Sequence, residues 1–266
     1  MSRTEYKIWD TIPGDYTEEP SVTHYKALIR ATDATVVIFP GGGYVGLSPT
    51  EGVSFAEFFN CMGMDAFVVK YRVSPHRFPS QLLDARRAIR FVRANAEKFG
   101  IDPNRVAVMG SSAGGHLAAL LCTYRGDLDA EGAEAIDEID CLPNAQILCY
   151  PVICMNDASV THMGSNHNLL GEDWERLAPT VSPNLIADEK TPKTFIWHTF
   201  DDSVVSVRNS LEYTNKLLSL NVPTELIIYP HGHHGEGLAP GFAINKRWRS
   251  ELDAWLRYIG FIDSKS

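Results

Sequence analysis

Short apolar runs alternate along this chain with longer segments of helical periodicity. The runs are about five residues long and rich in Val, Ile, Phe and Tyr, which is typical of strands buried on both faces of a parallel sheet. An earlier segment, His24–Ile29, predicts antiparallel strands at one edge of the same sheet. The six clearest runs predict strands at Val36–Phe39, Ala66–Lys70, Val106–Met109, Gln146–Tyr150, Thr194–His198 and Glu225–Tyr229.

Between these runs, apolar residues recur at intervals of three and four, which predicts amphipathic helices. The clearest such pattern extends from Ser80 to Phe99 and ends at Gly100, a residue type that commonly terminates helices. Strands that alternate with helices predict an α/β fold: a mostly parallel central sheet of about eight strands with helices on both faces. The remaining patterns predict helices from Leu117 to Tyr124, from Val204 to Leu220 and from Arg247 to Ile259.

Composition fits one globular domain over residues 1–266, because 44% of the residues are hydrophobic and 21% are charged. The formal net charge of −9 argues against a nucleic-acid partner, since phosphate backbones require clustered Lys and Arg. No apolar run approaches the 18 or so residues of a membrane span. The five scattered cysteines and an N-terminal segment without an apolar core predict a cytoplasmic protein. Whether the chain forms a homo-oligomer is left open by the sequence.

A serine follows the third predicted buried strand in a G-x-S-x-G pattern. In an open parallel sheet, ligands bind at the carboxyl ends of the strands. The residues 110–114 read GSSAG and lie between a strand and a helical pattern, which is the context that a catalytic serine on a sharp turn requires. Ser112 is therefore the candidate nucleophile, and the alternative is a serine that only caps the helix.

Three glycines follow the first buried strand, in the segment Pro40–Tyr44. Their bare backbone favours an oxyanion hole, with the N–H of Ala113 as a further donor. The alternative is a glycine-rich turn without a ligand, and phosphate-binding spacing is absent. Tyr44 is a candidate substrate contact at the border of this site, or else an anchor of the loop.

The last two predicted strands are followed by acids and histidines. Asp201 and Asp202 come after one, and His231, His233 and His234 after the other. An acid can orient a histidine base, so this loop pair is where we expect the rest of a catalytic triad. Metal binding by the histidines is the disfavoured alternative because HExxH spacing is missing, and no cofactor is implied. The order nucleophile, acid, histidine is that of α/β-hydrolases.

At these residues the chain resembles the carbohydrate-esterase branch of the α/β-hydrolase superfamily, close to acetyl-xylan-esterase-like and xylanase-associated esterase-like proteins. The resemblance implies Asp202 as the acid, His234 as the base, and Gly42, Gly43 and Ala113 as the oxyanion amides. Pro40 departs from lipase-like relatives, which often carry His there. The segments that carry the resemblance are FPGGGY (39–44), GSSAGGHLAA (110–119), YPV (150–152), HMGSNHNLLG (162–171), HTFDDSVV (198–205) and YPHGHHG (229–235).

The resulting hypothesis is a serine carboxylic-ester hydrolase that removes acetyl groups from carbohydrates such as acetylated xylo-oligosaccharides. The alternatives are a serine peptidase of the prolyl-oligopeptidase type and a non-catalytic ligand-binding protein of the same fold. Residues 153–193 are expected to cover the site. Their polar and aromatic side chains suit a sugar, although solvation of a surface loop explains them equally well; these are Asn156, His162, Asn166, His167, Asn168 and Trp174.

Three further residues receive structural interpretations. His116, within the helix that follows Ser112, is interpreted as a packed and hydrogen-bonded core histidine. Asp84 and Arg86 are interpreted as charges that serve helix electrostatics.

Overall fold

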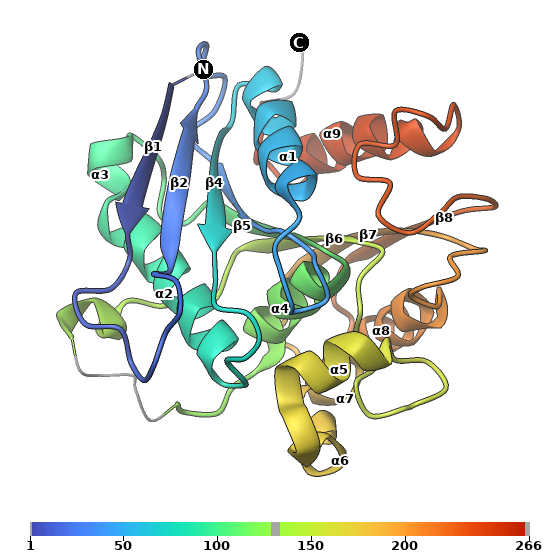
Figure 1. Ribbon diagram of the computed structural model, residues 1–266. Helices are drawn as coiled ribbons and strands as arrows, with labels where there is room; N and C mark the ends of the chain where they lie inside the picture. Colours follow the sequence, from blue (N-terminus) through green and yellow to red (C-terminus); the bar gives the residue numbers. More distant parts are fainter. Residues whose placement is uncertain (1, 129–133, 264–266) are drawn as a thin grey trace.

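The computed structural model describes residues 2–128 and 134–263 (Figure 1). Eight strands of this part of the chain form one sheet in the order β1-β2-β4-β3-β5-β6-β7-β8. β1 and β2 are antiparallel to their neighbours, and the six strands from β4 to β8 run parallel. The predicted mostly parallel sheet is confirmed. The strands are β1 (Ser2–Lys7), β2 (Ser21–Lys26), β3 (Thr35–Phe39), β4 (Asp65–Lys70), β5 (Val106–Ser111), β6 (Ala145–Cys149), β7 (Lys193–Thr199) and β8 (Thr224–Tyr229).

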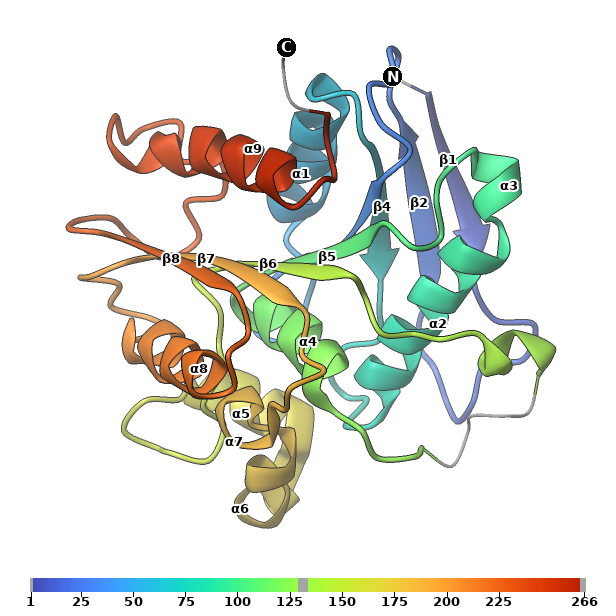
Figure 2. The same cartoon turned by 180° about the vertical axis from the view of Figure 1, so that it is seen from behind.

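Helices cover both faces of the sheet, as predicted: α1 and α9 lie on one face, and α2, α4 and α8 on the other (Figures 1 and 2). None of the helices in the described residues combines the length and apolar character needed to cross a membrane. The helices are α1 (Pro49–Cys61), α2 (Ser80–Ala94), α3 (Ala96–Phe99), α4 (Ser112–Thr123), α5 (Met163–Leu170), α6 (Trp174–Leu177), α7 (Pro183–Ile186), α8 (Arg208–Ser219) and α9 (Trp248–Tyr258).

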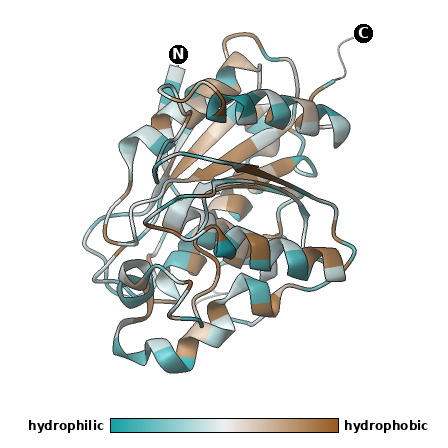
Figure 3. Ribbon diagram, turned by 90° about the vertical axis from the view of Figure 1, so that its right-hand side faces the viewer, coloured by the Kyte–Doolittle hydropathy of each residue, from teal (hydrophilic) through white to brown (hydrophobic). Residues whose placement is uncertain are grey.

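The sheet separates two hydrophobic cores, because neighbouring residues of a strand point to opposite faces. In β3, Val37 and Phe39 pack into the core beneath α2, α4 and α8, whereas Val36 and Ile38 pack into the core beneath α1 and α9. Apolar strands consequently lie between helices whose outer surfaces are polar (Figure 3). Burial on both faces explains why these strands appear as continuous apolar runs in the sequence.

Some elements differ from the sequence predictions. β1 was not predicted, because five of its six residues are exposed and it lacks an apolar face. β2 begins at Ser21, three residues before the predicted edge segment, and ends at Lys26. The single helix predicted from Ser80 to Phe99 is interrupted at Asn95, whose side-chain amide donates to the carbonyl of Phe91 at 2.9 Å.

Helix α1 was also missed by the sequence analysis. It begins with a proline and contains Gly52 in its first turn, so helical propensity is weak where the helix starts. Its position is set instead by packing, since Phe55 and Phe59 are fully buried against the sheet.

Asp84 and Arg86, which the sequence analysis assigned to helix electrostatics, are both buried and bind groups outside their own helix. Asp84 is fully buried, where a charge requires partners, and it accepts hydrogen bonds from the Arg72 guanidinium and the Trp9 indole at 2.9 Å. Arg86 is also buried, and its guanidinium donates to the carbonyls of Tyr124 and Gly126 at 3.1 Å. Both residues hold loops to the helix.

Candidate active site

Ser112 lies at the sharp junction where β5 ends and α4 begins. Its φ of 54° lies in the left-handed region, which is strained for a residue with a side chain. The junction is so tight that a Cβ on Gly110 would collide with the carbonyl of Gly114, and a Cβ on Gly114 with that of Phe39. The glycines of the G-x-S-x-G pattern are therefore required to present the serine at the strand end.

The loops after β7 and β8 bring an acid and a histidine to this serine. The Ser112 hydroxyl lies 2.8 Å from Nε2 of His234, and Nδ1 of His234 lies 2.7 Å from Oδ2 of Asp202. Because the carboxylate can only accept, Nδ1 carries the proton and Nε2 is free to accept from the serine. The structure thus brings together the nucleophile, base and acid that the sequence analysis assigned.

The Asp202 carboxylate is surrounded by hydrogen-bond donors. Oδ1 accepts from the backbone N–H groups of Val204 and Val205, both at 2.9 Å, and Nε2 of the buried His198 lies 3.3 Å from Oδ2. Burial by itself would raise the pKa of Asp202, but the hydrogen bonds from His198 and His234 outweigh it and hold the pKa below its ordinary value. The acid therefore stays ionised next to His234.

The neighbouring acid and histidines do not join this row. Asp201 contacts Nδ1 of His231 at 3.1 Å and accepts the N–H of Gly232 at 2.8 Å, whereas Nδ1 of His233 lies 3.0 Å from the carbonyl of His234. Within residues 2–128 and 134–263, no three His, Cys, Asp or Glu side chains are grouped to hold a metal ion.

The triglycine turn after β3 lies beside the serine. A Cβ on Gly41 would be 3.1 Å from Cβ of Ser112, and Gly42 and Gly43 have φ values of 135° and 62°. The carbonyl of Gly42 is turned away and accepts from the N–H groups of two later loop residues. In the described structure no hydrogen bond joins the N–H groups of Gly42, Gly43 or Ala113 to another protein group. These donors remain available for an anionic oxygen.

Glu51 is a buried carboxylate of α1 that the sequence analysis missed. Oε2 accepts the N–H of Gly41 at 2.9 Å, and Oε1 accepts the hydroxyl of Tyr150 at 2.7 Å. The Tyr150 hydroxyl in turn accepts the N–H of Gly237 at 3.0 Å, and its ring packs edge-to-face on His234 with centroids 5.1 Å apart. One carboxylate thereby connects the glycine turn to the histidine loop. No motif marks it, because the contact joins residues 99 positions apart.

The structure favours the interpretation of Tyr44 as a loop anchor over that as a substrate contact. It is fully buried, and its hydroxyl lies 2.7 Å from Nδ1 of His116, whose Nε2 donates to the carbonyl of Val181 at 2.8 Å. Burial lowers the pKa of His116 to about 4, so its ring is neutral at pH 7. Tyr44 is a loop anchor, and the interpretation of His116 as a core histidine is confirmed.

The segment 153–193 packs against the glycine turn through α5. The side-chain amide of Asn168 donates to the carbonyl of Gly43 at 2.9 Å, and the Ser165 hydroxyl would be 4.0 Å from a Cβ on Gly43. His162 caps the start of α5, where its Nδ1 accepts the N–H of Ser165 at 3.2 Å. Asn166 is fully buried and donates to a backbone carbonyl, so it is a structural residue.

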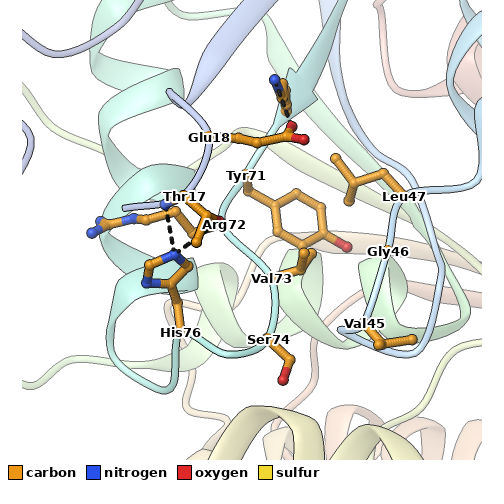
Figure 4. A pocket seen from close by; sticks show the side chains of 11 residues that line it. Thr17, Glu18, Val45, Gly46, Leu47, Tyr71, Arg72, Val73, Ser74 and His76 are labelled. Carbon is orange, nitrogen blue, oxygen red and sulfur yellow. Dashed lines mark hydrogen bonds and ion pairs between the residues drawn. The ribbon is translucent and has the colours of Figure 1, made fainter. Parts of the chain in front are cut away.

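A pocket of about 510 Å³ lies on the other side of the turn (Figure 4). Its walls include Val45 and Leu47, which lie two and four residues after the last of the three glycines. They also include His76, whose Nε2 accepts the N–H of Thr17 at 3.1 Å. Tyr71 occupies the centre of the view, but it is only 2% exposed and its hydroxyl donates to the carbonyl of Pro40 at 2.6 Å. Tyr71 thus anchors the residue that precedes the three glycines, from the side of the turn that faces this pocket.

The parallel sheet, the strand–serine–helix junction and the acid and histidine on the following loops define the α/β-hydrolase class. Within that class, the chain belongs to the BD-FAE family, whose profile matches residues 25–217.

Comparison with known proteins finds similar chains among enzymes of xylan breakdown. The chain is 33% identical over 230 residues to the acetylxylan esterase of Xylanibacter ruminicola, and 36% identical over 208 residues to endo-1,4-beta-xylanase B of Butyrivibrio fibrisolvens. These matches cover 84% and 75% of this chain but only 45% and 32% of the two relatives. The chain therefore spans less than half the length of these curated relatives.

Several solved structures match over nearly the whole length of both chains. The acetyl ester-xyloside bifunctional hydrolase of Caldicellulosiruptor lactoaceticus is 40% identical, with a TM-score of 0.90 and 97% of each chain covered. The fold is therefore shared over 97% of this chain.

Proposed function

We propose that this protein is a serine carboxylic-ester hydrolase that removes acetyl groups from carbohydrates such as acetylated xylo-oligosaccharides. The observation that carries the proposal is the row of Ser112, His234 and Asp202, joined at 2.8 and 2.7 Å beside unpaired backbone N–H groups. The names of its relatives, acetylxylan esterase and acetyl ester-xyloside hydrolase, support the choice of an acetylated sugar.

In the first step, Ser112 Oγ attacks the ester carbonyl while Nε2 of His234 takes the hydroxyl proton. Asp202 stabilises the imidazolium that forms. The carbonyl oxygen becomes negative and accepts hydrogen bonds from the N–H groups of Gly42, Gly43 and Ala113. The tetrahedral intermediate then collapses. The bond to the sugar oxygen breaks, and His234 gives that oxygen its proton.

In the second step, water replaces the sugar. His234 takes a proton from the water, whose oxygen attacks the acetyl–serine carbonyl through a second oxyanion in the same hole. Collapse of this intermediate breaks the bond to Oγ of Ser112, which takes the proton back from His234. The product leaves as acetic acid, which ionises to acetate by releasing its remaining proton to the solvent.

Substitution of the nucleophile tests the proposal. Ser112→Ala is expected to lower kcat for p-nitrophenyl acetate by about 10⁴-fold or more and to abolish labelling by a fluorophosphonate. Ser111→Ala is a matched control, because the Ser111 hydroxyl is buried one residue away without a hydrogen-bond partner in the described structure. Turnover or labelling that persists in a folded Ser112→Ala protein would exclude the proposed nucleophile.

Substrate profiling separates the proposal from its alternatives. Acetate release from acetylated xylo-oligosaccharides should be faster than hydrolysis of longer-chain esters, whereas a peptidase would prefer aminoacyl-proline amides. A binding protein of this fold would turn over neither substrate and would not react with the fluorophosphonate.

A further inference from the structure

A second hollow lies where α5 ends and α6 begins, at the outer end of the segment 153–193. It has a volume of about 470 Å³. We call it the Trp174 hollow, and its lining residues are Arg77, His167, Gly171, Glu172 and Trp174.

Helix α5 connects this hollow to the glycine turn. Ser165 and Asn168 face Gly43 from the helix, and Gly171 follows its last residue. With a rise of about 1.5 Å per residue, Gly171 lies about 4.5 Å along the helix from Asn168 and about 9 Å from Ser165. This separation suits a part of the substrate that extends away from the reacting ester.

The indole of Trp174 is held in place but not covered. Trp174 is partly exposed, packs at its inner side against the core, and has its ring centroid 6.0 Å from that of His167. Its N–H has no hydrogen-bond partner within the described residues. A preformed aromatic face with a free donor at its edge matches a sugar ring, which has an apolar C–H face and a rim of hydroxyl groups.

Arg77 provides fixed donors beside the indole. Its Nη1 donates to the carbonyls of His167, at 2.9 Å, and Asn168, so the guanidinium is anchored to the C-terminal end of α5. Within the described structure, Nε and Nη2 make no hydrogen bond, and their N–H groups remain available. Glu172 contributes acceptors and an opposite charge. Arg77, Glu172 and Trp174 together offer donors, acceptors and an apolar ring with no net charge. They favour a neutral, hydroxyl-rich ligand over an ionic one.

The pocket behind the glycine turn (Figure 4) is less suited to this role. Tyr71, its central aromatic residue, presents almost no surface, and a Glu18–Lys70 ion pair of 2.7 Å lies across its rim. Between these two hollows, the one at Trp174 is lined by a partly exposed indole, whereas the phenol ring of Tyr71 is buried.

We propose that the Trp174 hollow binds main-chain sugar units of the acetylated oligosaccharide, beyond the unit whose ester is cleaved. This inference rests on the proposed function for the identity of the ligand. It assigns α5 two tasks, which are support of the glycine turn at Gly43 and recognition of an extended substrate at its C-terminal end.

Paired substrates test the inference. In Trp174→Ala, the ratio of kcat/KM for acetylated xylo-oligosaccharides to that for p-nitrophenyl acetate is expected to fall about tenfold, equivalent to about 1.4 kcal/mol, mainly through KM. Trp174→Phe retains an aromatic face and should restore most of the ratio. Tyr258→Ala, which removes an 84% exposed aromatic ring from α9, is a matched control and should leave the ratio unchanged.

An unchanged ratio in Trp174→Ala would overturn the inference, as would an equal loss on both esters, which indicates a structural role. Calorimetry of the Ser112→Ala protein with unacetylated xylo-oligosaccharides provides a test that needs no turnover. Addition of Trp174→Ala should weaken this binding about tenfold. If the wild type cleaves neither ester but binds the sugar through Trp174, the proposed reaction fails and the inference survives. Absence of binding to the Ser112→Ala protein would overturn the inference.

Discussion

Two acid–histidine pairs lie side by side on the loops after β7 and β8, and they differ mainly in burial. Asp202 and His234 are 2.7 Å apart, with side chains 0% and 14% exposed. Asp201 and His231 are 3.1 Å apart, with side chains 46% and 83% exposed. The sequence places the two acids next to each other, so residue type cannot distinguish the pairs.

The difference shows that the position of the carboxylate determines what it can do. Asp201 is solvated, and an ion pair in water is screened and contributes little. Asp202 is removed from water and receives hydrogen bonds from Val204, Val205 and His234. In such surroundings a hydrogen bond orients the histidine strongly, because water does not compete.

The largest expected effect comes from Asp202→Asn. An amide cannot accept from Nδ1 of His234 in the same way while it keeps its other bonds, so the histidine loses both its tautomer and its charge stabilisation. We expect kcat for p-nitrophenyl acetate to fall about 10⁴-fold with little change in KM. Steady-state kinetics on the folded variant provide the measurement. A loss below tenfold would mean that burial of Asp202 has no catalytic importance.

The position of the nucleophile could be predicted from local sequence, whereas the choice of Asp202 over Asp201 and of His234 over His231 came from the family resemblance. Ser112 is recognisable because its turn of five residues leaves no space for side chains at the flanking glycines. β3 and β5 are recognisable because both of their faces are buried. Glu51 could not be predicted in its role, since its partner Tyr150 is distant in the chain and only the packing of α1 brings them together. β1 could not be predicted because its residues are mostly exposed, so it shows no apolar pattern.

Glu51 can be compared with Asp202, because it is also a buried carboxylate, but its two hydrogen-bond donors are neutral groups of Gly41 and Tyr150. In Glu51→Gln, the side-chain oxygen can accept from either Gly41 or Tyr150 but not both, and one buried donor loses its partner. An unsatisfied buried group costs about 1–3 kcal/mol. Loss of the bond to Gly41 would also displace the glycine turn and weaken its hydrogen bonds to the oxyanion of the transition state. We therefore expect kcat to fall about 10–100-fold.

The kinetic readout separates positioning from general stability. Glu57→Gln, at an exposed site on the same helix, is the matched control and should leave kcat and the melting temperature unchanged. Tyr150→Phe keeps the Gly41 contact but loses the link to Gly237, so its effect should be less than additive with that of Glu51→Gln. A lower melting temperature with unchanged kcat in Glu51→Gln would reduce Glu51 to a structural residue.

The pH dependence of stability gives a smaller effect with a defined sign. The pKa of Asp202 is lower in the folded state than in the unfolded chain, so folding favours the ionised form. Its contribution is complete above the ordinary Asp pKa of about 4 and is lost as the pH falls further, by an amount on the order of 2 kcal/mol. Urea unfolding of the wild type and Asp202→Asn should therefore differ less at pH 3 than at pH 7. A difference that grows on acidification would have the wrong sign.

The smallest effect is expected from Asp201→Asn, the same substitution one residue earlier. The asparagine oxygen can still accept the N–H of Gly232, which the wild-type carboxylate does at 2.8 Å, so the loop geometry is retained. What is lost is an exposed charge opposite His231, and salt already screens it. We expect kcat within twofold of the wild type and no measurable change in melting temperature at physiological ionic strength. If Asp201→Asn instead approached the loss seen in Asp202→Asn, the histidine loop would depend on its solvated acid as well, and burial alone would not explain the difference between the two pairs.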